Sequence, residues 1–166
     1  TFRRDGSSKF GTGNRYGNFP SFAVGWNVSK ERFMEKFPAI SNLKLRASWG
    51  MTGNDKIPYF GKYSLTESMI AVFGNPPSAN AATTYGVSGN PSLKWESTTQ
   101  RDVGLEISLL KSKLTGEFDY YNRDTKDILL ALATPDYLGN GQGAKVFFNA
   151  ASVRNKGLDL QIAYNG

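Results

Sequence analysis

Apolar and polar residues alternate with a period of two along five segments of the chain. The segments are residues 21–28, 43–52, 102–109, 114–121 and 157–164. One set of alternate positions is almost entirely apolar and carries no charge, whereas the positions between them are polar, charged or small. A period of two is the signature of a β-strand whose two faces meet different environments. The pattern therefore predicts five amphipathic strands.

The two predicted faces differ in charge and in the placement of aromatic rings. The polar positions carry every charged residue of these segments, namely Lys44, Arg46, Asp102, Glu106, Glu117, Asp119 and Asp159. The strands are about ten residues long, close to the length that crosses a tilted bilayer and longer than an ordinary strand. Trp26 and Tyr164 fall near one end of the apolar stripes, and Trp49 and Tyr120 fall near the other. Aromatic girdles of membrane barrels have this placement.

Short and long connections alternate between the predicted strands. Residues 110–113 form a tight hairpin, and residues 29–42 contain a short helical turn that Ser29 would cap and Pro38 would end. The stretches 53–98 and 124–154 are long and contain runs of Gly, Asn, Pro and Ser. Outer-membrane barrels show the same alternation, with short periplasmic turns and long extracellular loops.

These features predict a mainly β fold: the antiparallel strands of a transmembrane β-barrel, partial and with about five long strands, long extracellular loops and one short helical turn. Five strands cannot close a barrel, because the smallest types need about eight. Residues 1–166 are therefore expected to be a fragment of a single barrel domain. The alternative is a soluble β-sandwich, a carbohydrate-binding module, in which Leu105, Ile107, Leu158 and Leu160 would face a second sheet.

Composition narrows the choice of function. Aromatic residues make up 13% of the 166 residues, Gly numbers 18 and the charged fraction is 20%, which favours strands and turns. The chain lacks the run of about 20 apolar residues that a transmembrane helix needs. It does not start with a secretory signal, so a mature or truncated chain is expected.

The chain contains neither Cys nor His, which removes thiolate chemistry and the commonest general base. No metal and no cofactor is expected. The net charge is +6, but the basic residues are spread along the chain and form no basic stripe, so a nucleic-acid partner is not expected.

A set of short motifs follows in order along nearly the whole chain. They are residues 3–11, Arg15-Tyr16-Gly17, Phe19-Pro20-Ser21, Gly25-Trp26, residues 43–50, Thr52-Gly53-Asn54, Asn90-Pro91, Leu93-Lys94-Trp95-Glu96, Asp119-Tyr120-Tyr121 and Asn155-Lys156-Gly157. In this order they resemble the barrel of SusC/RagA-type TonB-dependent transporters. The individual motifs are weak, and their ordered set carries the resemblance.

The resemblance implies a barrel of about 22 strands that holds a plug domain. It also implies location in the cell outer membrane, energy from TonB through the plug, and a SusD-like surface lipoprotein as a lid. Its substrates would be oligosaccharides or peptides, taken up by Bacteroidetes. The chain would supply a C-terminal part of the barrel, without the plug and the remaining strands.

Candidate contact residues follow from this interpretation. Aromatic side chains of the long loops could stack on sugar rings or pack the loops against each other: Tyr59, Tyr63, Tyr85, Trp95 and Tyr137. The apolar stripes are expected to face membrane lipid through Phe22, Val24, Trp26, Leu43, Leu45, Trp49, Val103, Leu105, Ile107, Phe118, Leu158, Leu160 and Ile162.

The carboxylates of the polar positions invite a comparison with glycosidases. Glu106 and Glu117 flank the tight hairpin and are expected to lie close together. We expect them to pair with Lys44 or Arg46 of a neighbouring strand rather than to catalyse a reaction, so no catalytic residue is assigned and no enzyme is expected. Residues 3–6 are expected to form a turn. The scattered glycines of residues 11–17 lack the context of a nucleotide site.

Overall fold

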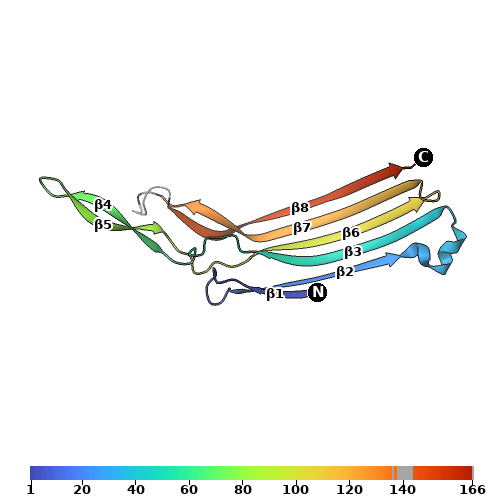
Figure 1. The fold of residues 1–166 in the computed structure, drawn as a ribbon, viewed down its shortest axis with the longest axis horizontal. Helices are drawn as coiled ribbons and strands as arrows, with labels where there is room; N and C mark the ends of the chain where they lie inside the picture. Colours follow the sequence, from blue (N-terminus) through green and yellow to red (C-terminus); the bar gives the residue numbers. More distant parts are fainter. Residues whose placement is uncertain (136, 138–143, 166) are drawn as a thin grey trace.

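The computed structural model describes residues 1–135, 137 and 144–165, except the side chains of residues 85 and 87. Within this part, six strands form one antiparallel sheet in the order β1-β2-β3-β6-β7-β8 (Figure 1). Their bounds are Phe2–Gly6 for β1, Tyr16–Asn27 for β2, Ile40–Asn54 for β3, Glu96–Leu109 for β6, Leu114–Ala133 for β7 and Lys145–Tyr164 for β8. Two further strands, β4 (Leu65–Phe73) and β5 (Ser78–Val87), pair with each other as a hairpin.

The six-stranded sheet is a single open layer with β1 and β8 at its edges. The β4–β5 hairpin extends away from one end of the sheet and does not cover either face (Figure 1). The alternative expectation of two packed sheets is therefore wrong. The fold matches the predicted partial barrel, whose strands run antiparallel and whose sheet does not close within the described residues.

The five predicted segments lie in β2, β3, β6, β7 and β8, except for Val28, which follows the end of β2. The strand register keeps their faces aligned. Trp26 pairs with Leu45, Leu45 with Leu105, Leu105 with Phe118 and Phe118 with Leu160. Because side chains alternate along every strand, the neighbouring row of paired residues lies on the opposite face. One sequence pattern thus becomes two continuous faces that cross all five strands.

The connection between β6 and β7 is the tight hairpin that the sequence predicts. Three of its residues adopt left-handed backbone angles, with φ of 54° at Leu110, 59° at Lys111 and 65° at Ser112. The N–H of Lys113 donates to the carbonyl of Leu110 at 3.3 Å. We call this end of the sheet the short-turn end and the opposite end, which carries the longer connections, the loop end.

The predicted long loops are partly wrong. β7 continues to Ala133 and β8 begins at Lys145, so strands occupy much of the expected loop 124–154. The hairpin β4–β5 lies inside the expected loop 53–98, and residues 3–6 belong to β1 rather than to a turn. The alternation that would reveal β7 and β8 is interrupted by register shifts between Thr125 and Leu129, where Asp127 has a φ of 56°.

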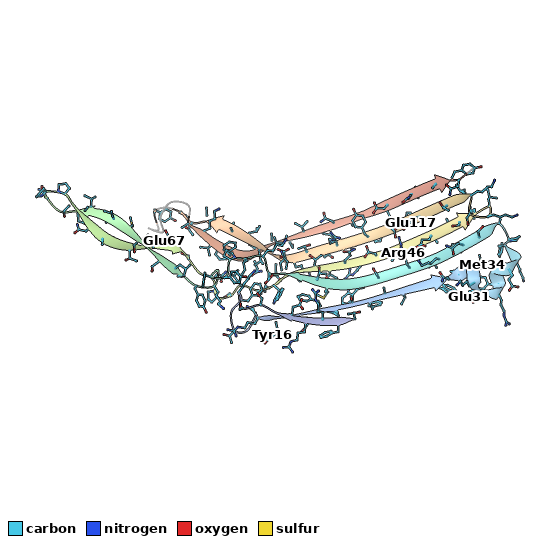
Figure 2. The ribbon with its side chains drawn as sticks, in the orientation of Figure 1. Tyr16, Glu31, Met34, Arg46, Glu67 and Glu117 are labelled. Atoms are coloured by element: carbon cyan, nitrogen blue, oxygen red, sulfur yellow. The ribbon has the colours of Figure 1, made fainter. Side chains whose placement is uncertain are left out.

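The connection between β2 and β3 contains the expected helical turns, as 3-10 helices η1 (Val28–Lys30) and η2 (Arg32–Lys36). The predicted cap is wrong, because Ser29 lies inside η1 and its hydroxyl hydrogen-bonds to Oδ1 of Asn42 at 3.3 Å. Figure 2 places Glu31 and Met34 at this end of the sheet and Glu67 on the distant hairpin. Within the described residues, no helix is long and apolar enough to cross a membrane.

Candidate functional site

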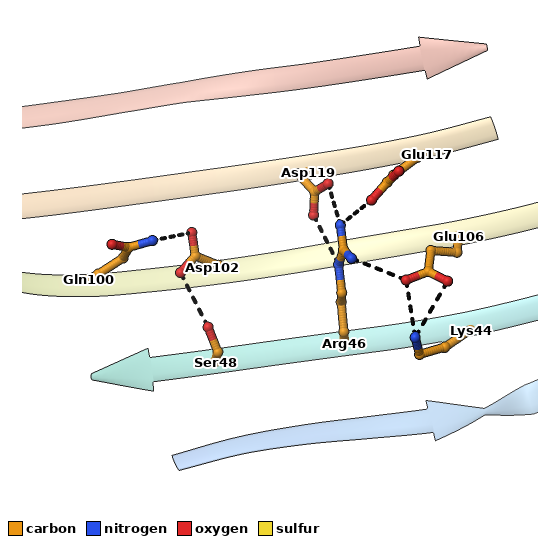
Figure 3. A network of polar contacts seen from close by, with 8 residues as sticks. All are labelled: Lys44, Arg46, Ser48, Gln100, Asp102, Glu106, Glu117 and Asp119. Atoms are coloured by element: carbon orange, nitrogen blue, oxygen red, sulfur yellow. Dashed lines mark hydrogen bonds and ion pairs between the residues drawn. The ribbon is translucent and has the colours of Figure 1, made fainter. Parts of the chain in front are cut away.

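The polar face of the sheet is organised around Arg46, in the middle of β3 (Figure 3). Its guanidinium donates to Asp119 of β7 through Nε at 3.2 Å and through Nη2 at 2.6 Å. Nη2 also bonds to Glu117 of β7, and Nη1 donates to Glu106 of β6 at 3.1 Å. Lys44 of β3 adds a second cation to Glu106, with Nζ 3.1 Å from Oε1. Side chains from three strands thus form one ionic network.

The register explains why these side chains meet. Glu106 lies directly opposite Glu117 and also opposite Lys44, so two carboxylates from adjacent strands share one row with a cation. Gly104 lies between Arg46 and Asp119, where a Cβ atom would sit 2.3 Å from Nε of Arg46 and from Oδ1 of Asp119. The absence of a side chain at Gly104 gives Arg46 the room to cross β6 and reach β7.

A ladder of hydrogen bonds continues from this network toward the loop end. The hydroxyl of Ser48 donates to Asp102 at 3.2 Å, and the amide of Gln100 donates to the other oxygen of Asp102 at 3.2 Å. Arg123 of β7 then donates to Gln100 at 3.0 Å. A concave surface of about 760 Å³ lies over this ladder, and its lining extends to Asp159 of β8.

The network confirms the expected pairing of Glu106 and Glu117 with Lys44 and Arg46. A pair of glycosidase carboxylates needs one group as an acid and the other as a nucleophile or base, both free to reach substrate. Here Arg46 bonds to both, and Lys44 also holds Glu106. The arrangement neutralises charge and joins three strands, which suits a wall against which another polar surface can pack.

A second cluster lies at the loop end, where five separate segments of the chain meet. Phe10, Ile57 and Leu93 are buried there, and partly buried side chains pack against them: Trp95, Leu129 and Phe147. Because Phe10 and Leu93 are fully buried, this cluster is a true core, although it is built largely from loop residues. We call it the loop core.

Side-chain hydrogen bonds fix the backbones around the loop core. The Asn14 amide donates to the carbonyl of Leu93 at 3.2 Å, and the Asn90 amide donates to the carbonyl of Phe147 at 2.9 Å. Nζ of Lys62 donates to the carbonyl of Ser8 at 2.6 Å. These bonds join residues that are more than 50 positions apart, so no local signal in the sequence could reveal the cluster.

Four of the five predicted loop aromatics have described side chains. Trp95 packs in the loop core, with its ring centroid 5.3 Å from that of Phe10, and its indole N–H donates to the carbonyl of Arg15 at 3.2 Å. The side chains of Tyr59, Tyr63 and Tyr137 are exposed, whereas that of Trp95 is partly buried. The side chain of Tyr85 lies outside the described residues.

Lysines contact two of the exposed rings. Nζ of Lys9 lies 5.3 Å from the ring centroid of Tyr59, and Nζ of Lys62 lies 5.0 Å from that of Tyr63. A cation over an aromatic face is attracted by the ring quadrupole. One face of each ring is thereby shared with a cation, which leaves the other face for a ligand or a neighbouring loop.

The face opposite the ionic network is apolar and uncovered. Val24 is 61% exposed, Leu160 is 70% exposed and Ile162 is 68% exposed. The register places the predicted apolar positions of all five strands on this same face. A contiguous apolar surface of this size marks contact with a membrane or another apolar surface.

Comparison with known proteins agrees with this architecture. Residues 1–165 match the family model described as TonB dependent receptor-like, beta-barrel. TonB-dependent receptor P3 of Formosa agariphila is 37% identical over 162 residues, covering 98% of this chain and 16% of that protein. TonB-dependent receptor SusC of Bacteroides thetaiotaomicron is 35% identical over 167 residues, with the same coverage. The chain thus spans about a sixth of the length of these curated relatives.

Solved structures show the same likeness. The RagAB peptide importer in its closed-closed state superposes with a TM-score of 0.79 at 28% identity, over 97% of this chain and 17% of that chain. The siderophore receptor PirA from Pseudomonas aeruginosa, at 16% identity and a TM-score of 0.56, shares the fold alone. The proteins of this kind lie in the outer membrane as β-barrels. The chain belongs to the family of TonB-dependent receptor β-barrels, and within it to the SusC/RagA type.

Proposed function

We propose that residues 1–166 form part of one barrel domain, the wall and extracellular loops of a transporter that takes up oligosaccharides or peptides with energy from TonB. The observation that carries this proposal is the contrast between the two faces of one sheet. An exposed apolar face backs directly onto an ionic network, and a sheet of this kind suits a barrel between lipid and a polar interior.

The apolar face is proposed to contact lipid through the side chains expected from the sequence, such as Val24, Leu105 and Leu160. The ionic network around Arg46 then faces the interior, where a plug domain of the intact protein would pack. This division gives the chain a mechanical role. It holds a rigid wall while a ligand passes along the polar side, and no step of the process requires a catalytic residue.

The loop end is proposed to bind substrate and a SusD-like surface lipoprotein. SusC and the RagAB peptide importer are the relatives that suggest such an assembly. Exposed rings at Tyr59, Tyr63 and Tyr137 offer apolar faces and polar edges, the combination that suits sugars and peptides. The loop core anchors two of these rings, because Tyr59 and Tyr63 follow the buried Ile57 closely in the chain.

A test of this function measures uptake in cells that lack the gene. Deletion is expected to abolish energy-dependent accumulation of labelled oligosaccharides or of labelled peptides, and the full-length gene is expected to restore it. A restored strain that carries Tyr59→Ala and Tyr63→Ala together should accumulate substrate at higher external concentrations only. Equal uptake of both substrate classes by the deletion strain and its parent would contradict the proposal.

A further inference from the structure

A group of cations lies on the apolar side of the sheet, just beyond the apolar rows toward the loop end. Arg101 of β6 pairs with Asn122 of β7, and Asn122 pairs with Lys156 of β8. Two residues further along these strands toward the loop end, Asp124 of β7 pairs with Arg154 of β8. Strand alternation places Arg101 on the same face as Val103, and Lys156 on the same face as Leu158. Lys126 of β7 lies on this face by the same alternation.

The group has a large excess of positive charge. It contains four exposed cations, Arg101, Lys126, Arg154 and Lys156, and a single carboxylate, that of Asp124. Arg154 forms an ion pair with that carboxylate. Arg101 and Lys156 form no ion pair within the described residues, so their charges are free to attract an anion.

An apolar groove of about 450 Å³ begins beside Arg101. Its lining comprises Phe22, Ala47, Ser48, Trp49, Arg101, Asp102 and Val103. Strand alternation turns the side chains of Ser48 and Asp102 to the opposite, polar face. The rings of Phe22 and Trp49 form one wall, with their centroids 6.0 Å apart. The groove could take an acyl chain, and the cations lie where the head group of such a chain would be.

The Asn122 side chain adds a further observation. It lies between Arg101 and Lys156 in the register, and its Oδ1 is buried without a hydrogen-bond partner among the described residues. Buried polar atoms normally have a partner, so an acceptor without one needs a reason. A head group with hydroxyl or amide donors would offer the missing bond after a small movement of the side chain.

We propose that this surface binds a phosphorylated, acylated glycolipid of the outer leaflet, with its phosphate on Arg101 and Lys156 and an acyl chain in the groove. Water alone would leave the groove uncovered, and hydrocarbon alone would leave the cations unpaired. An amphipathic anion satisfies both surfaces. Guanidinium groups bind phosphate oxygens in a bidentate manner, and cations near an anionic lipid surface strengthen binding to it. The inference rests on the proposed lipid-facing role of the apolar face.

The test uses the intact receptor in detergent and native mass spectrometry with diphosphorylated lipid A as the probe. Arg101→Gln together with Lys156→Gln is expected to weaken lipid A binding on the order of 25-fold, about fivefold for each cation removed. Arg123→Gln is the matched control, because Arg123 follows Asn122 in β7 but points to the polar face. It should bind lipid A as the parent protein does.

Two further probes identify what is recognised. Lipid A without its phosphates is expected to bind the parent protein as weakly as diphosphorylated lipid A binds the double variant. Inorganic phosphate at the same concentration as the lipid is expected not to compete. Unchanged lipid A binding by the double variant, an equal loss in Arg123→Gln, or effective competition by inorganic phosphate would each overturn the proposal.

A separate measurement distinguishes this inference from the proposed function. A nitroxide at Leu160 reports directly whether the apolar face meets lipid, because a relaxing agent dissolved in the bilayer reaches it only there. Relaxation at Leu160 with unchanged lipid A binding in the double variant would reject the glycolipid site alone. Absence of relaxation at Leu160 would reject the lipid-facing assignment, and with it the site that depends on it.

Discussion

At the scale of single residues, Arg46 is the cation that joins the carboxylates of the polar face. Its guanidinium bonds to Glu106, Glu117 and Asp119, which belong to two other strands. Removal of one charged side chain from such a network leaves its partners with uncompensated charge. The resulting loss of stability exceeds the net stabilisation that the intact ion pair provides. Without Arg46, Lys44 would still pair with Glu106, but Glu117 and Asp119 would lose their cation and repel each other.

Arg46→Met is therefore expected to destabilise the barrel by about 1–2 kcal/mol. This is below the 3–5 kcal/mol typical of a fully buried pair, because the side chain is 39% exposed and solvent screens the charges. Addition of Glu117→Gln and Asp119→Asn should restore much of the loss by removing the uncompensated charge. Thermal unfolding of the receptor in detergent measures both effects. A triple variant less stable than Arg46→Met would contradict the charge argument.

A second prediction at the residue scale concerns the space that Gly104 leaves for Arg46. Gly104→Ala would place a Cβ atom 2.3 Å from Arg46 and Asp119, so the two side chains must separate and their hydrogen bonds weaken. Crowding of this kind costs about 1–3 kcal/mol. Gly25→Ala is the control, because a Cβ atom there meets its nearest neighbour at 3.9 Å. The same unfolding measurement should show a loss for Gly104→Ala alone, and equal losses would refute the steric explanation.

At the scale of elements, the sequence predicts strands well where both faces of the sheet keep a constant environment. Residues 43–52 alternate without interruption, and β3 forms there as expected. The prediction fails where that condition ends. Beyond Thr125 the β7 residues 128–133 are continuously apolar, so the sequence of this part of the strand shows no alternation. The strand register also shifts here, next to Asp127 with its left-handed backbone. The short β1 is only five residues long and lies outside the alternating segments.

The candidate functional site was also predictable only in part. Pairing of Glu106 with Lys44 follows from neighbouring strands of the expected sheet, and it is confirmed. The loop core was not predictable, because Phe10, Ile57 and Leu93 meet only through long-range folding of separate connections. Gly104 was likewise missed, since the room it gives Arg46 exists only in the assembled sheet.

Loss of the loop core is expected to release the connections without unfolding the sheet. Phe10→Ala removes a fully buried ring, a change that costs about 3–5 kcal/mol where the surroundings cannot collapse. Hydrogen exchange should accelerate in residues 7–15 and 88–95, while β3 and β6 remain protected. Phe60→Ala is the control, because Phe60 is 59% exposed. Unchanged exchange in Phe10→Ala, or loss of protection throughout the sheet, would contradict a separate loop core.

At the scale of the whole molecule, one sheet separates two environments. The apolar face holds exposed aliphatic and aromatic side chains, and the polar face holds the ionic network that joins β3, β6 and β7. Neither face is covered by other parts of the described chain. The apolar face therefore needs an apolar partner outside it, whereas the polar face can meet water or another polar surface. Lipid on one side and the polar interior of a transporter on the other satisfy both requirements.

The most direct measurement of this account places nitroxides along β6 of the intact receptor in lipid vesicles. The labelled positions are Val103→Cys, Leu105→Cys and Ile107→Cys on one face, and Glu106→Cys and Ser108→Cys on the other. The account predicts that a relaxing agent dissolved in the bilayer acts on positions 103, 105 and 107 and has little effect on 106 and 108. Equal relaxation at all five positions, or strong relaxation at 106 and 108 instead, would contradict it.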